Sequence, residues 1–291
     1  MGARGRKKFD DAAARVAQAR DAMAERRDSA LGAMAERRDA ALDAAAQARA
    51  AAGERVAEAR EAAAERVADA REAAADAIAK VKPKLRGVTH EYAFFVSLFL
   101  GAGLILLAEG TRATLAVGVY AASLSALFGV SALYHRVNWR RPSARRWMRR
   151  LDHTMIFFLI AGTVTPFAVL VLEPPLATAL LVAVWAGAAA GTVVELIWID
   201  SPKWVSASVY IAVGLIGAAG FPAIVVEAGI AAGALIALGG ALYATGAVIY
   251  AAQRPDPSPR VFGYHEVFHV LVIAAAAAHF AAVALFALPA G

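Results

Sequence analysis

Residues 263–280 read GYHEVFHVLVIAAAAAHF, and this stretch opens the last long apolar segment of the chain. His265 and His269 are four residues apart, so a helix places both rings on one face, where they can hold a single metal ion. Glu266 completes the string HEVFH, which in soluble zinc proteases supplies two ligands and a general base. The apolar run continues to Leu288, and ionisable residues at the mouth of a membrane helix mark function by default. The stretch therefore predicts a metal site at the end of a membrane helix.

The composition divides the chain into two parts, at residues 1–86 and 87–291. The first part is rich in alanine and carries 19 basic and 15 acidic residues, whereas the second carries only 11 and 9. We interpret the first as a charged cytoplasmic helix and the second as an integral membrane domain. The chain has no cysteine, which excludes disulfides and thiolate metal ligands. The basic excess follows from membrane topology, so we expect no nucleic-acid partner.

The first part repeats with a period of eleven residues. AMAERRDSALG at 22–32 recurs as AMAERRDAALD at 33–43, and RVAEAREAAAE at 55–65 recurs as RVADAREAAAD at 66–76. Eleven residues over three turns favour a straight or slightly right-handed helix. Its apolar stripe is thin and mostly alanine, which is typical of a solvated helix or a weak coiled coil. A helix that binds a partner, another copy of itself or the membrane surface is the alternative.

The second part predicts an all-α, integral membrane bundle of seven transmembrane helices, which follows the long N-terminal alanine-rich helix. Each apolar segment is near the roughly 20 residues that span the hydrocarbon. The predicted spans are Tyr92–Leu107, Ala113–Tyr134, Met155–Leu172, Leu176–Ile199, Val205–Phe221, Ala228–Ala252 and Phe262–Leu288. Small residues crowd the fourth to seventh spans, which allows close approach of helices.

The basic residues predict the orientation of the spans. They precede the first span and follow the second, fourth and sixth, whereas the opposite loops contain one arginine, Arg112. Positive charge stays on the cytoplasmic side, so we expect a multi-pass protein of a bacterial inner membrane with the N-terminus in the cytoplasm and the C-terminus outside. The largest group follows the second span and consists of Arg136, Arg140, Arg141, Arg145, Arg146, Arg149 and Arg150.

This topology brings polar residues from several spans to one depth, at the inner leaflet. The group is Ser131, His135, Asp152, His153, His265, Glu266 and His269, with His90 just before the first span. Three histidines and a water form a common catalytic zinc shell. Asp152 is placed to hold or deprotonate that water.

Three motifs in this order carry a resemblance to a known family. SALYH at 131–135, RRLDHTMIFFLIAGTVTPF from Arg149 and GYHEVFHVLVIAAAAAHF together resemble the bacterial hemolysin III family. That family is related to the progestin and adipoQ (adiponectin) receptors and, more distantly, to alkaline ceramidases. The resemblance implies seven transmembrane helices and a zinc site with the ligands His135, His265 and His269. It also implies that Asp152 holds the water on the metal and that Ser131 lies just behind it.

Several of these residues also have simpler explanations. Asp152 can cap the third span, and small hydroxyls such as Ser131 are common in membrane helices. Glu266 lies about 100° around the helix from His265, so it need not face the metal. We expect His279 to be a packed, hydrogen-bonded histidine and Glu195 to reach the interface by snorkelling. The roles of His90 and His153 stay open.

Three functions are compatible with this sequence. The first is a zinc-dependent hydrolase of lipid amides or esters, with ceramide-like substrates implied by the resemblance alone, and with membrane lipids as its partners. The second is a non-enzymatic protein, either a receptor-like sensor or a pore-forming cytolysin, in which zinc is structural. The third is an intramembrane metalloprotease built on HEVFH, which ranks last because no acidic ligand follows Glu266.

Overall fold

The computed structural model describes residues 3–78 and 83–291, and every regular element in these ranges is a helix. The chain divides into two units, residues 1–78 and 79–291. The first unit contains one helix, α1 (Ala3–Ile78). The second contains α2 (Val88–Leu107), α3 (Gly110–Arg136), α4 (Pro142–Leu170), α5 (Leu176–Ile197), α6 (Lys203–Ala218), α7 (Phe221–Ala252) and α8 (Tyr264–Ala282). A π-helical turn, Val283–Ala287, and a short 3₁₀ turn, Leu288–Ala290, extend α8.

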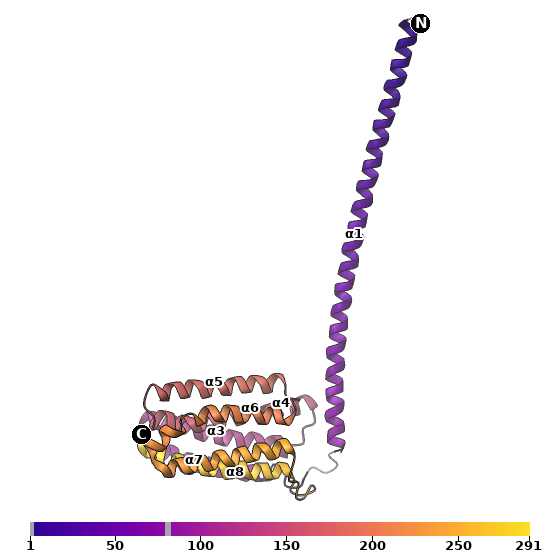
Figure 1. Cartoon of the computed structure of the whole chain (residues 1–291). Helices are drawn as coiled ribbons and strands as arrows, with labels where there is room; N and C mark the ends of the chain where they lie inside the picture. The colour runs from indigo at the N-terminus through magenta and orange to yellow at the C-terminus, as the bar shows by residue number, and fades with distance from the viewer. Residues whose placement is uncertain (1–2, 79–82) are drawn as a thin grey trace. The chain divides into compact units, whose positions relative to one another are not determined.

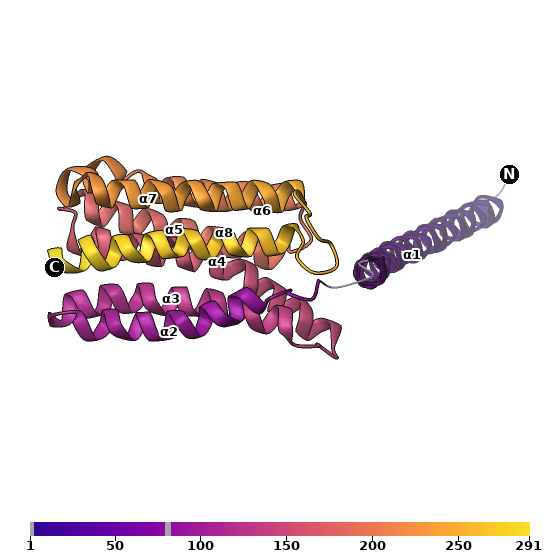
Figure 2. The same ribbon diagram turned by 90° about the horizontal axis from the view of Figure 1, so that it is seen from below.

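The helices α2 to α8 lie side by side in one bundle (Figures 1 and 2). Each helix packs on the next in the sequence, and α2 also packs on α8, so the first and last helices of the bundle meet. Six of these helices are long and apolar enough to cross a membrane, and α6 is a shorter apolar helix of 16 residues. The second unit is therefore a multi-pass, all-helical membrane domain.

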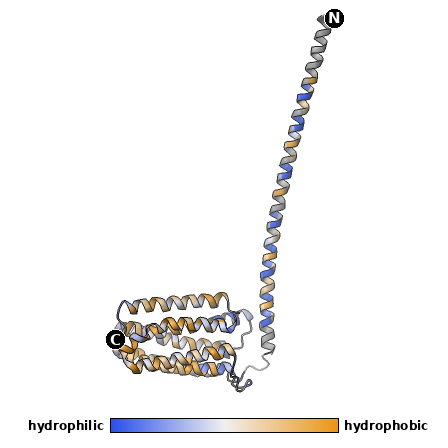
Figure 3. Ribbon diagram, viewed as in Figure 1, coloured by the Kyte–Doolittle hydropathy of each residue, from blue (hydrophilic) through white to orange (hydrophobic). Residues whose placement is uncertain are grey.

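Hydrophobic residues recur along all the helices of the bundle (Figure 3), and many of them lie on its outside. Large side chains on the outside are widely exposed, for example Phe99 at 81%, Leu106 at 85% and Ile230 at 82%. Several polar residues are buried instead, among them His90 and Glu195. A water-soluble domain shows the reverse distribution, so these outer faces suit lipid.

Small residues allow the close helix contacts that the sequence predicts. A Cβ atom on Gly191 of α5 would come within 2.8 Å of three ring atoms of Phe157 on α4, and one on Gly162 of α4 would lie 2.1 Å from the Ser123 Oγ of α3. Inside α7, Gly229 has φ 89° and interrupts the helical backbone, a conformation that glycine adopts without a steric penalty.

The arginine-rich stretch after α3 differs from its prediction. We placed Arg136 to Arg150 in the loop after the second span, but α4 begins at Pro142, so Arg145, Arg146, Arg149 and Arg150 are helical. Proline suits the first turn of a helix because its missing N–H would have no partner there. Asp152 and His153 therefore lie inside a continuous helix, about three turns from its start.

Candidate metal site

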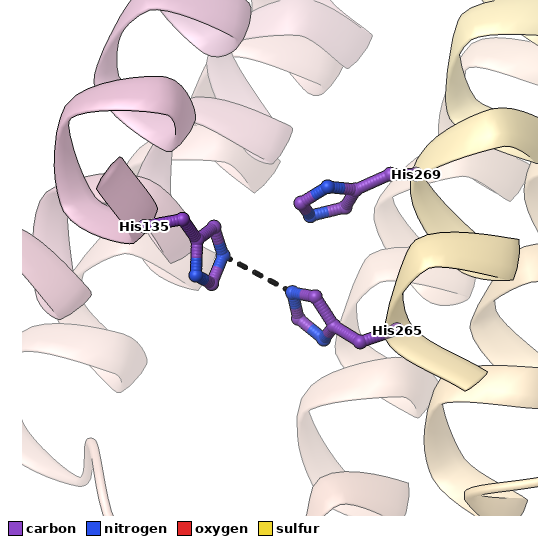
Figure 4. A group of neighbouring side chains, drawn as sticks. All are labelled: His135, His265 and His269. Atoms are coloured by element: carbon purple, nitrogen blue, oxygen red, sulfur yellow. Dashed lines mark hydrogen bonds between the residues drawn. The ribbon is translucent and has the colours of Figure 1, made fainter. Parts of the chain in front are cut away.

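Three histidines from two helices meet at the end of the bundle where α3 ends and α8 begins. His135 is in the last turn of α3, and His265 and His269 are in the first two turns of α8. Their rings converge on one point (Figure 4), and one ring nitrogen from each lies within 4.8 Å of the others. His135 Nε2 and His265 Nε2 are 3.1 Å apart. The structure therefore brings together the three predicted ligands as a group that could bind a metal.

The donor set suits a tetrahedral metal ion, and one pair of its nitrogens already has nearly the required spacing. With metal–nitrogen bonds of about 2.0–2.1 Å, two nitrogens of a tetrahedral site lie about 3.3–3.4 Å apart. The 3.1 Å between His135 Nε2 and His265 Nε2 is close to this value, whereas the His269 nitrogen, within 4.8 Å of the other two, would have to move closer on binding. His135 and His269 are buried and His265 is half-buried, so the three rings are held by packing. Three imidazoles without thiolates suit zinc, although other transition metals also accept such ligands.

Asp152 and Ser131 lie beside the three histidines. The Asp152 carboxylate approaches His135 Nε2 at 3.7 Å. Ser131 is buried one turn before His135 on α3. Both line a small cavity of about 40 Å³, together with His90, His153, Tyr210, Tyr250, His265 and His269. A carboxylate and a hydroxyl thus share the chamber next to the candidate metal ligands.

Glu266 faces away from this chamber and has a structural role. It is fully buried, and its carboxylate accepts a hydrogen bond at 2.8 Å from the Gly263 backbone N–H, which caps α8. Its other oxygen accepts a hydrogen bond from the Arg86 guanidinium. Both carboxylate oxygens are therefore engaged, and Glu266 holds the end of α8 that carries His265 and His269.

The segment before α2 forms a strap, residues 84–87, across this end of the bundle. Its backbone donates hydrogen bonds from Lys84 and Leu85 to the carbonyls of Arg260 and Val261, at 3.1 and 3.2 Å. Gly87 has φ 79°, and a Cβ atom there would lie 2.6 Å from His135 Cβ. The strap therefore touches both helices that supply the candidate ligands. Sequence reasoning missed it because these contacts join residues about 180 positions apart.

His90 stacks directly on one of the candidate ligands. Its ring lies 3.7 Å from that of His269 at an interplanar angle of 12°, and Phe128 packs on its edge. His90 is buried, and neither ring nitrogen has a hydrogen-bond partner among the described residues. His90 thus fixes the plane of His269 through packing.

A hydrogen-bonded pair of side chains, His153 and Glu195, lies next to Asp152. His153 Nδ1 is 3.1 Å from one oxygen of Glu195 on α5, and the Tyr210 hydroxyl donates to the other oxygen at 3.1 Å. The expectation that Glu195 snorkels to the interface is wrong, because only 2% of it is exposed and its carboxylate is hydrogen-bonded inside the bundle. His153 and Tyr210 also line the small chamber, so this pair belongs to the site. The sequence did offer a signal for this pair, because Glu195 is a lone glutamate near the end of an apolar span.

A larger cavity of about 470 Å³ begins next to the chamber. It is lined almost entirely by apolar residues of α4, α6, α7 and α8, and it shares five lining residues with the chamber, which are Leu127, Ile156, Tyr210, Phe268 and Val272. His279 lies on its wall, with Nε2 3.1 Å from the Ile236 carbonyl, in agreement with the prediction of a packed, hydrogen-bonded histidine. An apolar ligand thus has space beside the polar site.

The second unit matches known proteins along most of its length. A family model described as "Haemolysin-III related" matches residues 78–280, which include all three histidines. Hemolysin-3 of Bacillus cereus is 28% identical over 177 residues, covering 61% of this chain and 77% of that protein. Monocyte to macrophage differentiation factor of Homo sapiens is 28% identical over 200 residues, or 67% and 80% of the two chains. The family match leaves residues 1–77 outside.

Proposed function

Because the chain belongs to the haemolysin-III related family, we propose that its histidine group binds zinc and that the protein is a zinc-dependent hydrolase of lipid amides or esters. The observation that carries this proposal is the contact between the polar chamber and the apolar cavity, which share five lining residues. A cavity of about 470 Å³ lies within the usual range for small-molecule sites, roughly 300–1,000 Å³. It would hold an acyl chain while the amide or ester group lies in the chamber.

The ligands would leave a fourth coordination position open, as catalytic zinc sites do. Zinc, when bound, supplies a Lewis acid that polarises a carbonyl and makes a coordinated water more acidic. The role of the protein is then to orient the substrate and to move protons. Asp152, beside His135, is positioned to accept a proton from water. Ser131 faces the same chamber and can donate a hydrogen bond to the substrate carbonyl.

We assign to His153 the role of donating a proton to the leaving group. Its Nδ1 is engaged by Glu195, so its Nε2 is the nitrogen available to the chamber. A carboxylate on the first ring nitrogen fixes the ring and its tautomer, as in other histidines that act on substrates. Tyr210 holds the other oxygen of Glu195 and so keeps the pair in place.

The topology proposal uses α6 as the seventh span. This 16-residue helix lies between α5 and α7 in the chain. When it is counted as a span, the basic residues before α2, between α3 and α4, at the start of α6 and between α7 and α8 all fall on one side. We propose a bacterial inner membrane, with the N-terminus and the candidate site on the cytoplasmic side and the C-terminus outside. Residues 1–86 would then be a cytoplasmic appendage of the membrane domain 87–291.

The test is lipid turnover by the purified, zinc-loaded protein. A panel of lipid amides and esters is incubated with the wild type and with Asp152→Asn, and products are measured by mass spectrometry. We expect at least one lipid to be cleaved by the wild type and not by the variant, while both retain metal. Absence of turnover across the panel, with metal bound, would refute the hydrolase.

A second candidate is a non-enzymatic sensor or pore-forming protein with a structural zinc. The name Hemolysin-3 of the Bacillus cereus relative motivates the pore. In that case, histidine substitutions lower thermal stability, purified protein releases dye from vesicles, and lipid turnover stays absent. The geometry gives no support to a metalloprotease, because the Glu266 carboxylate is engaged by Arg86 and Gly263.

A further inference from the structure

The eleven-residue repeat of α1 sorts its charges by face. One column of the repeat is apolar or alanine throughout and consists of Met23, Met34, Ala45, Val56, Val67 and Ile78. An arginine stands four residues after each of the first five members, at Arg27, Arg38, Arg49, Arg60 and Arg71. In an eleven-residue repeat the chain turns about 98° per residue, so a residue four positions later points within about 35° of the first one. The arginine column therefore lies on the same face as the apolar column.

The acidic residues occupy the opposite face. Carboxylates stand two residues after four members of the apolar column, at Glu25, Glu36, Glu58 and Asp69, and also two residues before two of these members, at Glu54 and Glu65. A step of two residues is a rotation of about 196° around the helix axis, so these carboxylates point almost directly away from the apolar column. One face of α1 thus combines small apolar groups with guanidinium groups, and the other carries negative charge.

The apolar and basic face of α1 is exposed to solvent. The exposed fractions are 66% for Met23, 68% for Met34, 53% for Val56 and 50% for Val67. Leu31 and Leu42, about 65° from the apolar column on the arginine side, are also exposed. Nothing within the described part of the first unit covers this face.

We propose that this face of α1 binds the headgroup region of an anionic lipid bilayer. Arginine stems can lie along the apolar boundary while their guanidinium groups reach lipid phosphates. The carboxylates point to water, because an anionic surface repels them. The charge distribution therefore determines which face of α1 contacts the lipid and which face contacts water.

A second copy of α1 suits this face less well. Two such faces in contact would oppose arginine columns, and the carboxylates that could neutralise these arginines lie about 100–165° around the helix from them. Phosphates of a nucleic acid would satisfy the arginines but leave the apolar column in water. An anionic bilayer surface can both neutralise the arginines and cover the apolar column.

The weak apolar column is sufficient because the helix is tethered. Only nine residues, 79–87, separate the end of α1 from the start of α2, a candidate membrane span. Tethering makes the binding intramolecular, so a weak affinity per repeat can still hold the helix at the surface. Four basic residues between Lys80 and Arg86 add to the attraction of an anionic leaflet.

The absence of cysteine makes a direct test possible, because a single introduced cysteine can carry a nitroxide label. Full-length Val56→Cys and Val67→Cys report on the proposed lipid face, and Glu58→Cys and Asp69→Cys, two residues later in the same repeats, are the matched controls. The labelled proteins are reconstituted in vesicles of phosphatidylcholine alone and of phosphatidylcholine with phosphatidylglycerol in equal parts. Collision of the label with oxygen and with a water-soluble nickel chelate is measured by electron paramagnetic resonance.

We expect the chelate to reach Val56→Cys and Val67→Cys severalfold less than the controls in the anionic vesicles. This difference should disappear in phosphatidylcholine or at high salt, and when the five arginines are replaced by glutamine. Equal access at both faces in anionic vesicles would overturn the proposal. Protection that persists without anionic lipid, with spin–spin broadening at Val67→Cys, would also overturn it and indicate self-association.

Discussion

The pairing of Glu266 with Arg86 gives the sharpest prediction about how the site is held. We consider Glu266→Gln, which removes the charge but keeps an oxygen that can accept from the Gly263 N–H. The change leaves the Arg86 guanidinium, 21% exposed, next to a fully buried neutral side chain. The account gives Glu266 a structural role, so the variant should be less stable but should still bind metal.

The magnitude follows from the burial of the pair. Removing one partner of a fully buried ion pair costs about 3–5 kcal/mol. Because Arg86 keeps some contact with water, we expect about 2–3 kcal/mol here. For a domain of this size that corresponds to a decrease in Tm of roughly 4–12 °C.

The assay is thermal unfolding of the detergent-purified protein, followed by tryptophan fluorescence. Glu91→Gln is the matched control, because Glu91 pairs with Arg136 at 2.7 Å but both side chains are more than 40% exposed. An exposed pair contributes about 0–1 kcal/mol, so this control should hardly change Tm. An unchanged Tm for Glu266→Gln together with complete loss of activity would refute the structural role and indicate a catalytic base.

Further predictions concern the strap, the second pair and the cavity. Gly87→Ala should weaken metal binding, measured by competition with a chelator, because its Cβ would collide with His135 and its φ of 79° disfavours alanine. Glu195→Gln should lower kcat and alter its pH profile while KM and metal content stay unchanged, since His153 loses its orienting carboxylate. Ala247→Phe should raise KM without loss of metal, because it fills part of the apolar cavity; a raised KM in Glu195→Gln or an unchanged KM in Ala247→Phe would contradict these roles.

The sequence allowed the residues of the candidate site to be grouped, but not the contacts that hold them in place. His135, His265, His269, Asp152 and Ser131 could be grouped because the alternation of spans and the positions of basic residues assign each of them a depth. The structure places four of them, Ser131, Asp152, His265 and His269, around one chamber, and His135 lies next to it, 3.7 Å from the Asp152 carboxylate. Depth is a property of each span alone, so it can be read without knowing how the helices pack.

The supporting contacts depend on that packing and were not predicted. The partner of Glu266 is a residue 180 positions earlier, and the partner of His153 lies on another span, at Glu195. Neither pair leaves a local pattern in the sequence. Hydropathy also failed at the start of α4, because arginines conceal a helix that extends beyond the membrane segment.

The central claim is that the three histidines bind one metal ion, and metal content tests it most directly. Zinc is measured by mass spectrometry in the detergent-purified wild type, His265→Ala and His269→Ala, with His279→Ala as the control histidine outside the group. We expect about one zinc per chain in the wild type and in His279→Ala, and none in the other two variants. A wild type without metal, or metal that survives both substitutions, would contradict the account.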